Sequence, residues 1–237
     1  MELVECRPVR ATKLSGEVVC GRPGARGHAC AGYCSAMRLS QPRVHLTTDS
    51  DLDDDSRPIL EGIERNGGRI LNIFRTLAHH PKLLKRWMVF ANHVLVGSTL
   101  PARERELVIL RTGYLCGSGY EWAQHVTIAR RCGLSDAEIE RIALGPSAAE
   151  WSNSDRQLLA ATDELTNTKF ISDSTWAALS ERWNTQQLID LVFAVGQYTL
   201  VSMALNTFGV QLEHDTEAFP ATLFVDGKFP LPENRSR

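Results

Sequence analysis

Glu121 and His125, a carboxylate and an imidazole, lie four positions apart in this chain. On an α-helix this spacing places both side chains on one face, where the carboxylate can hydrogen-bond the imidazole and share a proton with it. Trp122 falls on the same face and would keep the pair partly dry. The pattern predicts acid–base chemistry, although each residue taken alone also fits an ordinary ion pair or a core histidine.

Glu106 is a second candidate carboxylate. It lies in the charged segment 103–106 of a preceding predicted helix, where it fits either a first-turn acid favoured by the helix dipole or a further member of the site. Three glycines at positions 113–119 interrupt the apolar run, so we expect Glu106 and His125 to occupy separate, angled helices. Ser118, at this break, is typical of a helix N-cap rather than of a nucleophile.

Two segments, RELVILR at 105–111 and CGSGYEWAQH at 116–125, resemble the carboxymuconolactone decarboxylase family, which includes the alkylhydroperoxidase D branch. The resemblance is widest over residues 80–145. It continues less distinctly to about residue 213, where Val195-Gly196-Gln197-Tyr198 is similar to longer members of the family.

The chain combines motif residues of two branches of this family. In the alkylhydroperoxidase D branch a Glu precedes the pattern Cys-x-x-Cys-x-x-x-His. Aligned on His125, that Glu falls at Glu106, whereas Ser118 and Glu121 take the positions of the two cysteines. The decarboxylase branch instead places a carboxylate four residues before the His, as Glu121 does here, but it does not characteristically carry the acid found at Glu106.

The resemblance implies an all-α protein, with a single alkylhydroperoxidase D-like helical domain that assembles into a helix-rich homo-oligomer, a trimer or hexamer. It implies lyase-type, decarboxylase-like chemistry on a small carboxylated or lactone compound, with no metal or cofactor. We expect Glu121, His125 and Glu106 to be catalytic, and Tyr120, Trp122 and Arg111 to bind the substrate. Arg111 is the candidate clamp for a substrate carboxylate, although a surface salt bridge explains it equally well.

Two other functions compete with this interpretation. A peroxidase or disulfide reductase needs an attacking thiolate and a resolving thiol, which Ser118 and Glu121 cannot supply. Cys116 and Cys132 lie too far apart along a helix for a disulfide, so inert packing thiols are preferred. The chain could also form a non-catalytic helical oligomer that binds a small apolar ligand. An enclosed pocket lined by Glu121 and His125 would argue against that alternative.

Composition limits the class of protein and of partner. The 237 residues are 43% hydrophobic and 23% charged, which suffices for one ordinary core. A formal charge of -2 and a pI near 6.4 give no electrostatic reason to expect a nucleic acid or an anionic membrane as partner. Because the N-terminus lacks the apolar run of a signal peptide, we expect a reducing, cytoplasmic location.

We expect three parts: a disordered N-terminal extension (1–37), the helical domain (38–218) and an irregular C-terminal tail (219–237). Met37 is a candidate for the true start. A zinc site is the alternative for the extension, which contains Cys20, His28, Cys30 and Cys34. Their spacing matches no common zinc-binding pattern, and His79, His80 and His93 also lack partners at ligand spacing.

Helix signals recur through the domain. Predicted starts lie at Ser56, Pro81, Pro101, Ser135, Ser154, Asp173 and Thr185. The last predicted helix runs from Thr185 to Gln211 and is apolar nearly all round, yet Asp190, Gln197 and Asn206 argue against a membrane span. We therefore expect it to be buried in the domain core or in a subunit interface.

Overall fold

The computed structural model describes residues 37–216, which contain nine α-helices, one π-helix and no strand. The elements are α1 (Arg57–Arg65), α2 (Asn72–Leu77), α3 (Pro81–Asn92), η1 (His93–Gly97), α4 (Ala102–Leu115), α5 (Gly119–Arg131), α6 (Asp136–Leu144), α7 (Asn153–Thr168), α8 (Asp173–Ser180) and α9 (Thr185–Phe208). The predicted all-α class is confirmed. The predictions for the N-terminal extension and its cysteine cluster lie outside the described residues, apart from Met37, and the predicted C-terminal tail (219–237) lies wholly outside them.

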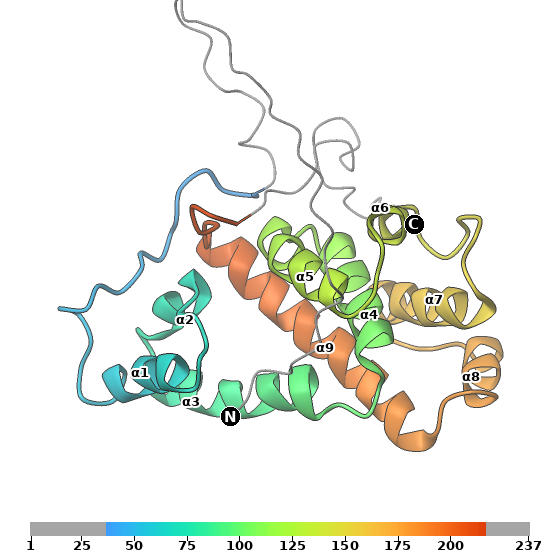
Figure 1. Cartoon of the computed structure of the whole chain (residues 1–237), viewed down its shortest axis with the longest axis horizontal. Coiled ribbons are helices and arrows are strands. Elements are labelled where there is room, and N and C mark those ends of the chain that lie inside the picture. The colour runs from blue at the N-terminus through green and yellow to red at the C-terminus, as the bar shows by residue number, and fades with distance from the viewer. Residues whose placement is uncertain (1–36, 217–237) are drawn as a thin grey trace, which may run out of the picture.

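Figure 1 shows α1–α3 on one side of the molecule and α6–α8 on the other, with α4 and α5 between them and α9 running diagonally across. α4 packs against α5, α7 and α9, and every residue from Arg105 to Tyr114 is buried. A helix enclosed in this way needs no polar face. Its few charged side chains must therefore find partners inside the protein.

The break between α4 and α5 is built from glycines, as the sequence predicts. Gly117 has a positive φ of 60°, which turns the chain out of α4. Gly113 allows the two helices to approach closely, because a Cβ added there would lie 3.5 Å from the Cβ of Glu121. Ser118 occupies the N-cap position of α5, but its side chain makes no capping hydrogen bond.

Most predicted helix ends agree with the structure, and the exceptions have local reasons. The capping box that begins α6 at Ser135 is present. α7 begins earlier than predicted, because the Ser152 hydroxyl rather than that of Ser154 caps it by accepting a hydrogen bond from the Asp155 N–H. The helix predicted to start at Asp173 ends at Ser180, and Trp183 lies in the turn between α8 and α9 with its side chain buried.

α9 is the longest helix and nearly matches its prediction. It ends at Phe208, three residues before the predicted Gln211, because Gly209 adopts the left-handed conformation with φ 69°. By length and composition alone α9 could cross a membrane, with a mean hydropathy of 1.7, and half of that 18-residue window is buried inside the protein. This test is weak evidence, since buried core helices also pass it.

Candidate functional site

His125 lies between two carboxylates that come from different helices. Its Nδ1 is 2.7 Å from Glu106 Oε2 of α4, and its Nε2 is 3.1 Å from Glu121 Oε1, one turn earlier on α5. The side chains of His125 and Glu121 are almost fully buried, and Glu106 is completely inaccessible to solvent. We call Glu106, Glu121 and His125 the triad.

The two carboxylates hold His125 in its charged form. Burial by itself would lower the pKa of the imidazole, but attraction and hydrogen bonding to Glu106, and then to Glu121, outweigh it and raise the pKa to about 10. At neutral pH the imidazolium therefore donates one N–H to each carboxylate. Neither ring nitrogen has a lone pair available for a substrate proton in this arrangement.

Arg105 is the cation next to the triad. Its Nε lies 3.6 Å from Glu106 Oε1, too far for a hydrogen bond, and both atoms are buried without a hydrogen-bond partner among residues 37–216. Unsatisfied buried polar atoms are rare and often mark a functional site. With Arg105 and His125 positive, the charges of Glu106 and Glu121 are balanced, so the cluster is neutral overall.

Tyr198 of α9 completes the surroundings of His125 and is not among the site residues predicted from the sequence. The two rings meet edge to face, with centroids 4.8 Å apart at an angle of 87°. Burial, followed by the charges of Glu121 and Glu106, holds the pKa of Tyr198 well above 10, so the phenol stays a hydrogen-bond donor. The only signal in the sequence was the family-like segment 195–198, which contains it.

The aromatic residues predicted to bind substrate have other contacts. Trp122 lies in the hydrophobic core, with its ring 5.9 Å from that of Tyr114. The Tyr120 hydroxyl donates a hydrogen bond to Glu213 Oε1 at 2.7 Å. The structure therefore places both beside the triad along α5, but engages the Tyr120 hydroxyl elsewhere.

Arg111 is buried and joins three helices. Its Nε and Nη2 donate to the two carboxylate oxygens of Asp163 at 2.6 and 2.8 Å, and its Nη1 lies 2.8 Å from the Ile142 carbonyl and 3.1 Å from that of Ala143. The salt bridge that was the alternative to a substrate clamp is therefore present, with Arg111 buried and Asp163 partly exposed. The charge of Arg111 is committed to Asp163, which leaves Arg105 as the cation nearest the triad.

Thiol and metal chemistry find little support in the described part of the chain. Cys116 and Cys132 form no disulfide, and burial raises the pKa of the Cys116 thiol, which disfavours the reactive thiolate. Within residues 37–216 no group of three His, Cys, Asp or Glu side chains is arranged to hold a metal ion. Of the histidines that were weighed as metal ligands, His80 caps α3, and His93 Nε2 lies 3.5 Å from Asp190 Oδ1.

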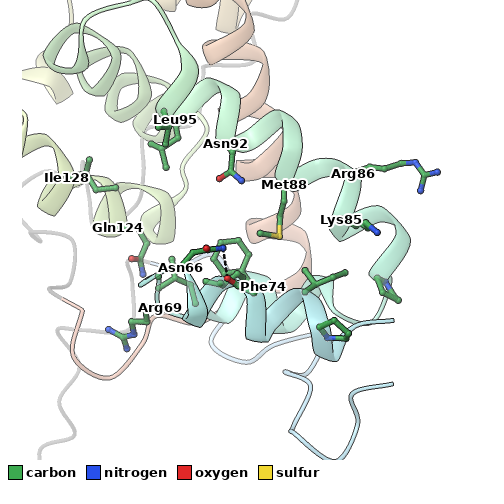
Figure 2. Close-up of a pocket in the computed structure, with 18 of the residues that line it drawn as sticks. Asn66, Arg69, Phe74, Lys85, Arg86, Met88, Asn92, Leu95, Gln124 and Ile128 are labelled. Carbon is green, nitrogen blue, oxygen red and sulfur yellow. Dashed lines mark hydrogen bonds between the residues drawn. The ribbon is translucent and has the colours of Figure 1, made fainter. Parts of the chain in front are cut away.

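A cleft of about 1490 Å³ lies apart from the triad. Its lining comes from α1, α3 and the side of α5 that carries Gln124 and Ile128, and Figure 2 shows these two facing Met88 and Asn92 of α3. No triad residue lines it. The predicted pair thus neither lines this cleft nor points into bulk water, but is enclosed between α4, α5 and α9.

Comparison with known proteins agrees with this fold. Residues 81–164, which contain the triad, match the model of the carboxymuconolactone decarboxylase family. A protein from Ralstonia eutropha JMP134, described as an alkylhydroperoxidase AhpD core and uncharacterized peroxidase-related protein, is 20% identical with a TM-score of 0.64 over 73% of this chain and 93% of that one. A peroxidase-related protein from Silicibacter sp. TM1040 is 16% identical with a TM-score of 0.65 over the same shares.

The debrominase Bmp8, solved as a point variant in complex with 2,3,4-tribromopyrrole, shares the fold at 14% identity and a TM-score of 0.61. The match covers 72% of this chain and 91% of that one. The search of curated proteins found no match. At these identities the structures establish an alkylhydroperoxidase D-like fold, as the sequence predicts, and no particular activity.

Proposed function

We propose that this protein is an enzyme that performs lyase-type acid–base chemistry on a small carboxylated or lactone compound, as the match of residues 81–164 to the carboxymuconolactone decarboxylase family model suggests. The observation that carries the proposal is His125, held as a cation between Glu106 and Glu121 in an enclosed site. Strongly shifted groups enclosed with specific charged partners are characteristic of acid–base catalysts.

The geometry assigns a different task to each member of the triad. Both N–H groups of His125 point at carboxylates, so a proton that leaves the imidazolium passes first to Glu106 or Glu121. Glu106 is fully enclosed and anchors the ring, whereas Glu121 keeps a small accessible fraction. We therefore assign the exchange of a proton with substrate to Glu121 and the recharging of Glu121 to His125.

In a decarboxylation, the bond between carbon and the substrate carboxylate breaks, carbon dioxide leaves, and the electron pair stays on a carbon conjugated to a carbonyl. The resulting enolate oxygen needs a positive charge or hydrogen-bond donors, which His125 and the protonated Tyr198 supply. His125 passes its Nε2 proton to the Glu121 carboxylate, and the protonated Glu121 delivers that proton to the carbanion carbon. Solvent finally returns a proton to His125, so the site ends in its starting state.

A ligand-binding protein without catalysis is the second candidate. The observation in its favour is the cleft lined by α1, α3 and α5, which is large enough for a small molecule and contains no triad residue. The debrominase, which shares this fold, has been solved in complex with the small molecule 2,3,4-tribromopyrrole. Under this alternative, substitutions in the triad would not affect binding.

A turnover screen with a library of small carboxylated and lactone compounds tests the proposal. On any substrate found, Glu121→Gln and His125→Gln should each lower turnover roughly a hundredfold, and the double variant should be little worse than either. Glu140→Gln, at an exposed position of α6, is the matched control and should keep full activity. Full activity in His125→Gln, or small additive losses, would refute the paired mechanism and favour the binding protein.

A further inference from the structure

The cleft between α1, α3 and α5 has apolar walls. Six half-buried apolar side chains line it, namely Ile59, Ile63, Phe74, Met88, Leu95 and Ile128. The first four pack on one side against the small core cluster of Leu60, Ala78 and Leu84, so the wall is fixed in place from behind. The volume of about 1490 Å³ exceeds the roughly 300–1,000 Å³ of ordinary small-molecule pockets, so the cleft suits an extended chain better than a compact ring.

Gly62, in the middle of α1, leaves one wall of the cleft without a side chain. Glycine weakens a helix interior relative to alanine, so its presence there needs a reason. Neither conformation nor packing supplies one, because Gly62 is helical and a Cβ added to it would meet only Arg65 Nη2, at 3.9 Å. Since Gly62 lines the cleft, a larger side chain at this position would narrow it.

The first two turns of α3 carry three cations that all line the cleft, Lys82, Lys85 and Arg86, which we call the basic cluster. Within residues 37–216 none of the three forms an ion pair. The N-terminal end of a helix disfavours cations, and like charges three or four residues apart repel one another. The first turn of α3 also contains no acid to relieve this. Local rules broken in this way are characteristic of a functional surface, here one that lacks an anion.

The charge of the whole lining has the same sign. Five cations and three carboxylates line the cleft, a net charge of +2 in a chain whose overall charge is -2. Figure 2 shows Lys85 and Arg86 at one end of the cleft, Met88 in the middle and Ile128 at the other end. From Lys85 to Leu95, along α3 and η1, the apolar wall extends for roughly 15 Å. The cleft therefore has a cationic end and a long apolar body.

We propose that the cleft binds a single-chain amphipathic carboxylate of the fatty-acid class, with its carboxylate at the basic cluster and its chain along the apolar walls toward Ile128. The carboxylate supplies the missing counter-charge, and the chain covers the half-buried side chains. Because these side chains line the inside of a cleft, a single chain can enter where the surface of a bilayer cannot follow. No triad residue lines the cleft, so this site goes beyond the proposed lyase chemistry and is independent of it.

Isothermal titration calorimetry of the full chain with dodecanoate, below its micelle concentration, tests this site. We expect saturable binding, weakened about tenfold or more when Lys82→Gln and Lys85→Gln are combined, because the carboxylate loses its partners. Arg65→Gln combined with Arg182→Gln removes the same charge at exposed positions outside the cleft and should bind like the wild type. Butanoate, which lacks the long chain, and dodecyltrimethylammonium, which has the opposite charge, should each bind about tenfold more weakly or less.

Gly62→Leu locates the chain without changing any charge. It should keep or raise the melting temperature, because leucine favours a helix over glycine, while it narrows the cleft and weakens dodecanoate binding about tenfold or more. Gly196→Leu is the matched control, since this helical glycine lies outside the cleft and nothing lies within 4 Å of a Cβ added there.

Four results would each overturn the proposal: no saturable binding of dodecanoate, equal binding of butanoate or dodecyltrimethylammonium, unchanged binding in either cleft variant, or binding of the chain to phosphatidylcholine vesicles but not to dodecanoate. Glu121→Gln should bind dodecanoate like the wild type, because Glu121 does not line the cleft. Failure of this site and failure of the proposed lyase activity are therefore distinguishable.

Discussion

Replacing Glu106 with Gln tests the electrostatics of the triad directly. The substitution removes the negative charge 2.7 Å from His125 Nδ1 while it keeps the size of the side chain and a hydrogen-bond acceptor. Loss of one adjacent opposite charge lowers the pKa of a buried cation by about 2. The fall is only partial because Glu121 remains on the other side of the ring. We therefore expect the pKa of His125 to fall from about 10 to roughly 8, a loss of ~3 kcal/mol in the stabilisation of the imidazolium.

The same change alters how stability depends on pH. The pKa of His125 is raised on folding from 6.5 to about 10, so its stabilising contribution is complete below pH 6.5 and disappears as the pH rises through 10. For the full shift this contribution has an upper limit of about 5 kcal/mol. Glu106→Gln should show a smaller loss, confined to roughly pH 6.5–8, and should be less stable than the wild type at neutral pH.

Two measurements check this prediction. NMR titration of the histidine Cε1–H signals gives the pKa of His125, and urea unfolding at pH 6, 8 and 10 gives the free energy of unfolding. Glu104→Gln, on the same helix but paired with Arg103, is the control and should leave the pKa of His125 unchanged. A wild-type His125 that titrates near 6.5, or a pKa that Glu106→Gln does not lower, would show that the carboxylates do not hold the imidazole charged.

Tyr198→Phe removes only a hydroxyl that makes no hydrogen bond to a described residue, so kcat should fall about ten- to a hundredfold with little change in melting temperature. An unchanged kcat would exclude the phenol from the reaction. Replacing Cys116 and Cys132 together with Ser should leave turnover intact, since the partly buried Cys116 thiol has a raised pKa; a loss of turnover in a folded variant would restore a thiol mechanism. Arg111→Met leaves Asp163 unpaired and should lower the free energy of unfolding by about 3–5 kcal/mol in urea titrations without raising KM, whereas a raised KM with normal stability would make Arg111 the substrate clamp.

The sequence by itself determined the local parts of this protein. The four-residue spacing of Glu121 and His125, the capping box at Ser135 and the glycines between α4 and α5 are all confirmed as local structure. These features depend on helix geometry and on hydrogen bonds between residues a few positions apart, and a short stretch of sequence contains that information. The family resemblance added the all-α, alkylhydroperoxidase D-like fold.

Only the tertiary structure decided which distant groups meet. Glu106 is buried beside His125 because α4 is enclosed by α5, α7 and α9, whereas its position in a charged segment fits a surface acid equally well. Tyr198 reaches His125 from α9, and Arg111 finds Asp163 from a helix 52 residues later in the chain. Such contacts arise from packing between helices, which the periodicity within one helix does not specify.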